Sequence, residues 1–395
     1  MTAGRRPFAR LGRIAPAVAL LVAFALGAVL LRDRPAPGTA PGEPGGGPSA
    51  PVSDEMVQAL LARTEDSGFA RPSGPWEISL PRDHGGHPAA RAETWMLAAQ
   101  LEDAAGRPAS VQFSLSRFGL VPETAAQTDE SWALRALYRA DLAVLQPGDT
   151  ELRAGERFSR GAGAAGHDRQ SGEVWLDDWT LSWETEPEAA PELALAARLG
   201  ALRVDLSLVP EKAPVRAAGG DAPFRGFALS RLSVRGRILA EGEAVAVSGT
   251  AWLDRAWGEL PLPGGPLGYD RLQLQLDDGT ELSLVRTRRR DGRGPVTVDG
   301  FLVNASGGTV ALSDGGLSMM PRDAGTAGAG DGPRYPVAWR LSGPDMDLDV
   351  APLAGDGARA FAFGGRALPV RAEGRHAGRK VTGRGILQMT GYDAP

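Results

Sequence analysis

The chain of 395 residues contains no cysteine, only four histidines and only four tyrosines. Without cysteine there can be no disulfide framework, no thiolate nucleophile and no cysteine-ligated metal site. The formal net charge of -5 at pH 7 argues against a basic surface, so we expect no nucleic acid among the partners. The sequence also lacks a Gly-x-Ser-x-Gly segment, which argues against the serine nucleophile of a strand–turn–helix hydrolase.

The N-terminal region carries a membrane-targeting signal. An uncharged apolar run spans residues 14–31 and follows four arginines, Arg5, Arg6, Arg10 and Arg13. Its length approaches that of a spanning helix, and the arginines fix its N-terminal end in the cytoplasm. We therefore expect residues 1–32 to form a signal anchor or a signal peptide. An anchor gives a single-pass inner-membrane protein with its domains on the periplasmic side, whereas cleavage gives a secreted protein.

The rest of the chain is predicted to be all-β after a linker. Residues 33–52 hold six prolines and five glycines and predict a disordered tether. From about Trp76 onward, alternating apolar runs are separated by turn residues at roughly 8–15 residue spacing, which is typical of an antiparallel sandwich or barrel. We predict an N-terminal domain over 53–215 and a C-terminal domain over 216–395, divided before Gly219-Gly220.

Two hairpins are predicted most directly. Residues 272–276 and 281–285 flank Asp278-Gly279, and the period of two places three leucines on one face and two glutamines on the other. A second hairpin joins residues 94–101 to residues 110–117. Glu93 and Trp95 open the second hairpin, and Tyr269 and Asp270 precede the first. This shared acidic and aromatic pair indicates two related β domains.

Several separated motifs resemble one known family. They are Pro81–Pro88 (PRDHGGHP), Glu93–Trp95 (ETW), Val247–Arg255 (VSGTAWLDR), Gly268–Asp270 (GYD) and Thr390–Tyr392 (TGY). In this order the chain resembles the AttH and carotenoid 1,2-hydratase (CrtC-like) family, whose members are often called secreted hydrolases. The resemblance runs from about Trp76 to Tyr392. It implies two lipocalin-like antiparallel β-barrel domains with a hydrophobic pocket, and a role on long apolar polyenes or beside ABC transporters.

The chain departs from that family at three aromatic segments. Where the family has Glu-Trp-Trp-Tyr, this chain has Glu93–Met96 (ETWM). A usual Tyr-Tyr-Ser is replaced within Phe227–Ser230 (FALS), and a usual Tyr-Trp-Glu-Gly by Arg371–Gly374 (RAEG). Because this chain has fewer aromatic residues in these segments, we favour a ligand-binding role over a carotenoid-type reaction.

The first functional hypothesis is therefore a binding or carrier protein for an apolar or amphipathic, lipid-like small molecule. An ABC transporter permease is a candidate partner, with the membrane reached through the N-terminal helix. The candidate ligand-binding residues are Glu93, Trp95, Trp252, Asp254 and Arg255, because aromatic faces can hold an apolar body and an arginine can bind a carboxylate. An internal salt bridge is the alternative role for the charged members.

The second hypothesis is a hydratase or isomerase of an isoprenoid-like polyene. By the resemblance, Asp270 is the proton donor, while Tyr269 and Trp257 stabilise a carbon cation. The alternative is that Asp270 caps a strand or forms a structural, buried ion pair with Arg255. His84 lies near another histidine in a Gly-rich loop rather than on a helix, so we expect no metal site, and no cofactor is predicted.

Overall fold

The computed structural model describes ten ranges, 68–122, 134–184, 192–216, 222–259, 266–312, 316–322, 326–327, 334–355, 359–361 and 365–392. Every regular element within them is a β-strand. No helix that could cross a membrane occurs in these ranges. The predicted anchor and linker, residues 1–52, lie outside the described residues.

The first sheet has twelve strands in the order β4-β3-β2-β1-β12-β11-β9-β8-β7-β6-β5, and β10 pairs with β11. Its strands are β1 (Ala92–Asp103), β2 (Pro108–Gly119), β3 (Ala136–Leu145), β4 (Arg153–Ser159), β5 (Ala165–His167), β6 (Val174–Leu176), β7 (Trp179–Glu184), β8 (Glu192–Leu199), β9 (Leu202–Pro210), β10 (Val215–Arg216), β11 (Phe224–Ala240) and β12 (Glu243–Gly258).

The second sheet has ten strands in the order β16-β15-β14-β13-β24-β23-β21-β20-β17, and β22 pairs with β23. Its strands are β13 (Leu267–Leu276), β14 (Glu281–Arg289), β15 (Thr297–Val303), β16 (Thr309–Leu312), β17 (Ser318–Pro321), β20 (Trp339–Gly343), β21 (Met346–Pro352), β22 (Arg359–Phe361), β23 (Gly365–His376) and β24 (Arg379–Met389). A two-stranded sheet joins β18 (Thr326–Ala327) to β19 (Tyr335–Pro336).

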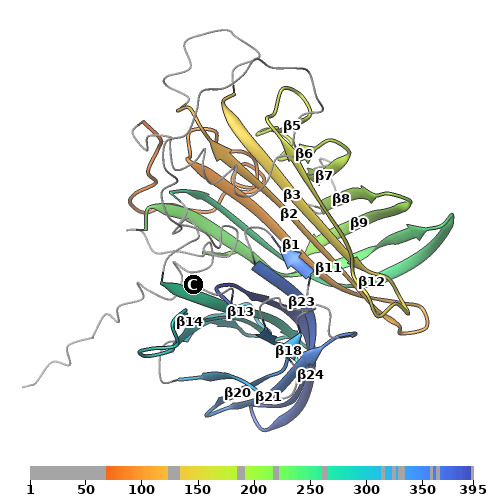
Figure 1. The fold of residues 1–395 in the computed structure, drawn as a ribbon, viewed down its shortest axis with the longest axis vertical. Helices are drawn as coiled ribbons and strands as arrows, with labels where there is room; N and C mark the ends of the chain where they lie inside the picture. Colours follow the sequence, from red (N-terminus) through yellow and green to blue (C-terminus); the bar gives the residue numbers. More distant parts are fainter. Residues whose placement is uncertain are drawn as a thin grey trace, which may run out of the picture.

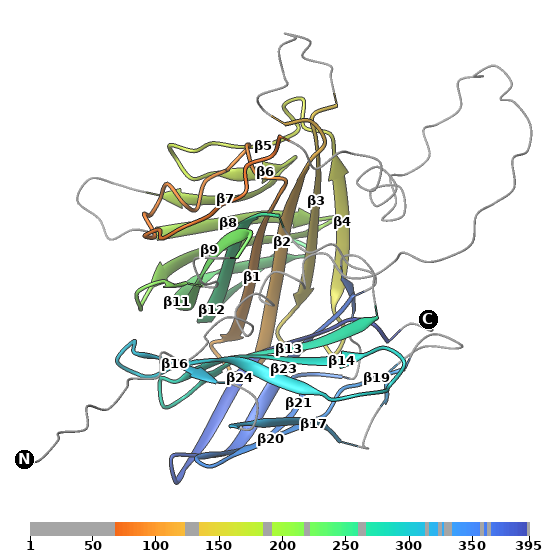
Figure 2. The same cartoon turned by 90° about the vertical axis from the view of Figure 1, so that its left-hand side faces the viewer.

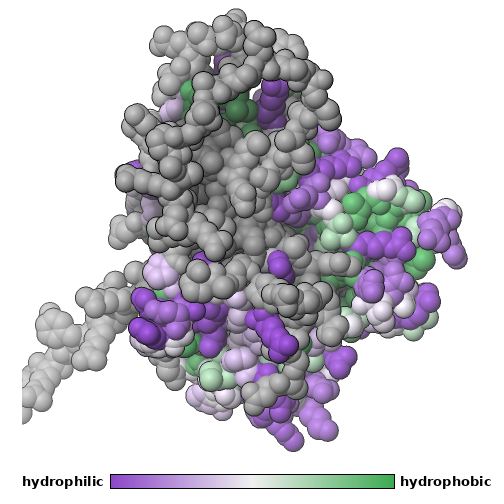
Figure 3. Space-filling model, viewed as in Figure 1, coloured by the Kyte–Doolittle hydropathy of each residue, from purple (hydrophilic) through white to green (hydrophobic). Residues whose placement is uncertain are grey.

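The two large sheets are barrel-like, one nearly closed and the other a half-barrel, and the predicted fold class is confirmed. The long strands β1 to β4 of the first sheet stand above the second sheet, whose strands β13 and β14 run across them (Figures 1 and 2). Each sheet encloses its own apolar core, and Trp95 and Trp339 are fully buried in the first and second core respectively. In Figure 3 the described parts of the visible face are mainly hydrophilic.

Both predicted hairpins are present. Strands β13 and β14 pair with Leu272 opposite Leu284, and Gly279 in their turn has a φ of +81°, which glycine adopts without strain. Strands β1 and β2 form the second hairpin, with Glu93 opposite Arg117.

The sheets divide the chain between Gly258 and Leu267, whereas the sequence placed the division at 215/216. Strands β11 and β12 belong to the first sheet, since β11 pairs with β9 and β12 pairs with β1. The Pro- and Gly-rich punctuation around residues 214–220 therefore marks a connection within one sheet. This pairing joins β1 to a strand about 150 residues later and places both in the middle of the first sheet.

Candidate functional site

Strand β12 separates the predicted ligand-binding residues between two faces. Successive side chains of a strand point to opposite faces. Arg255 and Trp257 accordingly face the interior of the first sheet, while Trp252 and Asp254 lie on its outer face against the second sheet. The structure therefore does not bring Trp252, Asp254 and Arg255 into one cavity.

Arg255 pairs with Glu93 inside the first sheet. Both side chains are fully buried, and Nη2 of Arg255 lies 2.5 Å from Oε2 of Glu93. The guanidinium carbon stands 3.8 Å from the ring centre of Trp95 and 5.2 Å from that of Trp257. Arg255 also donates hydrogen bonds to the carbonyls of residues 84, 85 and 256. These contacts fasten the segment before β1 to the wall of the sheet.

Glu93 and Arg255 are both charged at neutral pH. Burial alone would raise the pKa of Glu93, but the charge of Arg255, a hydrogen bond with His87 and the charge of Arg117 hold that pKa far below its usual value. Burial lowers the pKa of Arg255 to about 10. The alternative expected from the sequence, an internal salt bridge, is the arrangement that the structure places here for Glu93 and Arg255.

Two histidines lie close to Arg255 in this interior. His87 stacks on Trp257 with ring centres 4.0 Å apart, and burial lowers its pKa. His84 is fully buried beside Trp183, at a ring-centre distance of 5.7 Å, and neither ring nitrogen has a partner in the described part of the chain. Burial and the nearby Arg255 lower the pKa of His84 to about 3. No group of three metal-ligating side chains forms among the described residues.

The buried ring of His84 predicts a pH-dependent stability. Its pKa is 6.5 in the unfolded chain and about 3 in the folded one, so the unfolded chain binds the extra proton between these values. The free energy of unfolding should therefore fall as the pH drops from 6.5 toward 3. His84→Leu should flatten this slope in urea titrations at a series of pH values. An unchanged slope would mean that His84 is not the titrating group.

Asp270 lies in the other interior, that of the second sheet. It is fully buried on β13, and its Oδ2 is 2.8 Å from Nη1 of Arg286 and 3.4 Å from Nε of Arg288. Burial raises the pKa of Asp270, and the two guanidiniums oppose that rise. The predicted alternative partner Arg255 is engaged elsewhere.

The aromatic groups near Asp270 differ from those expected. Trp257 lies in the interior of the first sheet, and Tyr269 precedes Asp270 on β13 and is only half-buried. The second interior instead holds Trp339 beneath Arg286, and Tyr392 packs against Arg288. Burial and the charge of Asp270 raise the pKa of Tyr392.

A third set of residues, which the sequence did not single out as a group, fills the space between the two sheets. We call it the interfacial layer. From the first sheet it takes Met96, Ala98, Gln100, Ser110, Gln112, Trp252 and Asp254, and from the second Arg271, Gln273, Phe301, Ala367, Ile386 and Gln388.

Direct contacts join the two sides of this layer. Asp254 accepts hydrogen bonds from Trp252, at 2.9 Å, and from Gln273, at 3.1 Å, and its Oδ2 lies 2.7 Å from Nη2 of Arg271. Trp252 packs on Phe301 with ring centres 6.0 Å apart. Two of the predicted residues, Trp252 and Asp254, are thus brought together here.

Several buried polar atoms of the layer have no hydrogen-bond partner in the described part of the chain. They are Nε2 and Oε1 of Gln100, Oγ of Ser110, Nε2 of Gln112 and Oε1 of Gln388. Ala98 of β1 touches Ala367 and Ile386 across the layer. The strand register places Gln112 beside Ala98 and Gln388 beside Ala367, so these amides flank the same contact. The alternation of leucine and glutamine in β13 was the available sequence signal, because its glutamines form a buried face.

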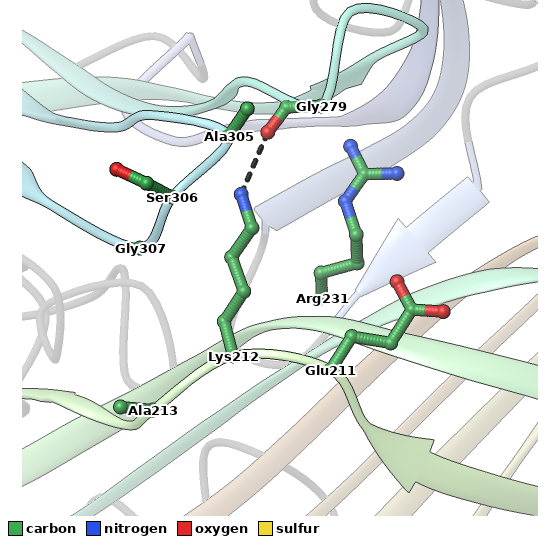
Figure 4. A pocket seen from close by; sticks show the side chains of 8 residues that line it. All are labelled: Glu211, Lys212, Ala213, Arg231, Gly279, Ala305, Ser306 and Gly307. Atoms are coloured by element: carbon green, nitrogen blue, oxygen red, sulfur yellow. Dashed lines mark hydrogen bonds between the residues drawn. The ribbon is translucent and has the colours of Figure 1, made fainter.

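At one edge of the layer, ion pairs bridge the sheets around a pocket of about 470 Å³. Lys212 reaches across the pocket and donates to the carbonyl of Gly279, with Arg231 beside it (Figure 4). Lys212 and Arg231 also pair with Glu281, at 2.7 and 2.5 Å. These cations are occupied in holding the sheets together, so the pocket offers a ligand little free charge.

Several solved structures share this architecture. A candidate AttH from Nitrosomonas europaea aligns over 82% of this chain and 100% of its own length, with a TM-score of 0.68 and 24% identity. Kievitone hydratase from Nectria haematococca aligns over 83% and 96%, with a TM-score of 0.57 and 15% identity. A complex of CghA with Sch210972 aligns over 84% and 98%, with a TM-score of 0.50 and 16% identity.

No curated protein matches the chain. The sequence model of the AttH-like family matches residues 71–392, nearly the whole of the part with described strands. Of the motifs that carry the resemblance, Glu93–Trp95 and Val247–Arg255 lie in the first sheet and Gly268–Asp270 in the second, while Pro81–Pro88 precedes β1 and Thr390–Tyr392 follows β24. The chain belongs to the AttH-like family and has its double lipocalin-like fold.

Proposed function

We propose that the chain binds an amphipathic organic molecule in the interfacial layer. The observation that carries this proposal is a set of buried amides with unpaired atoms, both atoms of Gln100, Nε2 of Gln112 and Oε1 of Gln388, in side chains that are each only 3% exposed. A buried polar group left without a hydrogen bond costs about 1–3 kcal/mol. A bound molecule that supplies hydrogen-bonding groups at these positions would remove that cost.

The surroundings of these amides suit the apolar part of the same molecule. Met96, Ala98 and Ile386 are buried in the layer, and the Trp252–Phe301 pair forms an aromatic wall at its side. Ligand sites commonly combine such apolar walls with a few placed polar groups. The layer therefore favours a ligand with an apolar body and hydrogen-bonding substituents.

Native mass spectrometry of the full chain, purified gently from its own host, tests the proposal. We expect a stoichiometric organic molecule on the wild-type protein. The double variant Gln112→Leu/Gln388→Leu should lose about tenfold or more in occupancy, because both amides would contact the ligand. The ligand-free variant should be as stable as the wild type or more stable, since leucine carries no unpaired polar atom.

Gln146→Leu is the matched control, because this glutamine pairs with Asp149 at the surface and lies outside the layer. It should keep full occupancy. A wild-type protein that carries no organic molecule and binds none on addition would refute the proposal.

A hydratase or isomerase activity is the second candidate, and the raised pKa of buried Asp270 favours it. A carboxyl that keeps its proton can donate it to a carbon–carbon double bond. The fold is compatible with such chemistry, since a protein of the same fold is named kievitone hydratase. Asp270 and Arg271 point to opposite faces of β13, so this reaction would take place inside the second sheet.

Asp270→Asn separates the two candidates. A hydratase that uses Asp270 as its acid should lose at least about a hundredfold in turnover, the usual contribution of a placed general acid. Binding in the interfacial layer should change little, since the side chain faces away from it. Hydration of the extracted molecule, followed by mass spectrometry, is the measurement. Full turnover in the variant would remove Asp270 from the mechanism.

The place of action is part of the proposal. The apolar run at 14–31, preceded by arginines, supports tethering to the inner membrane with both sheets on the periplasmic side. A carrier so placed could exchange its ligand with an ABC transporter permease. Cleavage of the run would instead release the protein.

A further inference from the structure

Arg271 is a cation sealed within the interfacial layer. Its side chain is fully buried on β13, opposite Gln388 of β24. Nη2 of Arg271 lies 2.7 Å from Oδ2 of Asp254, an ion pair across the two sheets. Nε and Nη1 have no hydrogen-bond partner among the described residues. A guanidinium has five N–H donors and accepts no hydrogen bond, so several donors remain available inside the layer.

The charge of Arg271 is already balanced. Asp254 neutralises it directly. Arg139, a cation on the outer face of β3, is held by Asp141 at 2.8 Å and Glu156 at 2.9 Å. Lys212 and Arg231 at the other edge share Glu281. The layer therefore supplies donors without a surplus of positive charge.

We propose that Arg271 selects the ligand through an uncharged carbonyl oxygen. This inference rests on the proposed function, because it names the ligand class of the same layer. The carbonyl oxygen accepts hydrogen bonds from Nε and Nη1 of Arg271, and the apolar body lies beside the contact that Ala98 makes with Ala367 and Ile386. Gln388, opposite Arg271 in register, has an unpartnered Oε1 that can accept from a hydroxyl of the same molecule.

Two other ligand classes fit this layer less well. A hydrocarbon polyene would bury the donors of Arg271 against carbon and leave them without partners, which costs more for a charged group than for a neutral one. A carboxylate would bring a second negative charge to a cation that Asp254 already neutralises, and its desolvation would not be compensated. Arg271 thus discriminates in favour of a ketone, ester, lactone or amide.

Three chain-matched probes test the inference by isothermal titration calorimetry on the full chain. They are 2-tridecanone, tridecane and tridecanoate, which differ only at the end of the molecule. We expect the ketone to bind about tenfold or more tightly than either of the others, since hydrogen bonds to a charged donor favour it. Equal or tighter binding of tridecane or tridecanoate would overturn the inference but leave the layer as a binding site. Failure of all three to bind would overturn the inference, and the occupancy of the protein from its host would then decide the proposed function separately.

The double variant Arg271→Gln/Asp254→Asn removes the ion pair without leaving one charge buried alone. It should keep its affinity for tridecane within about threefold and reduce the preference for the ketone to about threefold or less. The matched control is Arg384→Gln/Glu102→Gln, which removes another ion pair between the sheets, at 2.9 Å, whose side chains are 35% and 46% exposed and do not belong to the buried layer. The control should keep the ketone preference. An unchanged preference in the Arg271 variant would show that this residue does not set it.

Discussion

Replacing Arg255 with methionine is expected to lower the free energy of unfolding by about 3–5 kcal/mol, because one partner of a buried ion pair is removed while the other stays buried. Glu93 would be left in the interior with its remaining partner Arg117, whose Nη1 is 3.2 Å away. The carbonyls of residues 84 and 85 would lose their donor at the same time. Urea titration followed by circular dichroism measures the effect.

A matched pair and a double variant show whether the burial of this ion pair is the cause. Arg384→Met breaks an ion pair with Glu102 whose side chains are 35% and 46% exposed, and such a pair contributes at most about 1 kcal/mol. Arg255→Met/Glu93→Gln should recover part of the lost stability, because the side chain at position 93 is then uncharged, while Arg117 keeps its hydrogen bonds to the carbonyls of residues 88 and 90. If Arg255→Met lowered the free energy of unfolding by less than about 1 kcal/mol, Arg255 would not be the residue that holds the segment before β1 against the sheet.

The alternation of side chains along a strand predicted which residues face the core of a sheet, but it did not predict what covers the opposite face. In β13 it placed Leu272 and its leucine neighbours on one face, and that face is the core of the second sheet. From the sequence alone, the glutamine face of β13 is the same whether water or another sheet covers it. Gln273 is 4% exposed because the outer face of β12 covers it. A period of two specifies which residues share a face, and the packing of the sheets decides what that face touches.

The site residues show the same limit. Applied strictly to β12, the period of two separates Trp252 and Asp254 from Arg255, yet the motif as a whole suggested one cavity. The partner of each residue depends on pairing between distant strands: β1 lies against β12, so that Trp95 is opposite Arg255. No local pattern contains that register, because the paired residues lie far apart in the sequence.

Proline and glycine residues predicted the connections between strands better than they predicted the boundary between the two domains. The residues around 214–220 interrupt the strand pattern, but the chain on both sides of them belongs to the first sheet. A turn signal reports the local backbone, and it carries no information on which sheet the next strand joins. The long strands β11 and β12 therefore fell on the wrong side of the predicted division.

Gly385→Ala should have the second large effect, through the middle of the second sheet. Gly385 lies on β24 opposite Leu274 of β13. A Cβ at this position would stand 1.8 Å from the carbonyl oxygen of Gln273 and 3.0 Å from Cα of Leu274. Both are backbone atoms of a paired strand, so no side-chain rotation can relieve the overlap. We expect a loss of about 3 kcal/mol or more in the free energy of unfolding, at or beyond the usual upper range for overpacking.

Gly106→Ala separates this overlap from an ordinary loss of glycine. Gly106 lies in the turn between β1 and β2 with a φ of +75°, and a Cβ there would meet no atom within 4 Å. Its replacement costs only backbone strain, about 1–2 kcal/mol. Because Gly385 sits beside the strand that carries Arg271 and Gln273, its alanine variant should also lose ligand in the interfacial layer, whereas the Gly106 variant should keep it. Equal stability losses in the two variants would contradict the close approach of β24 to β13.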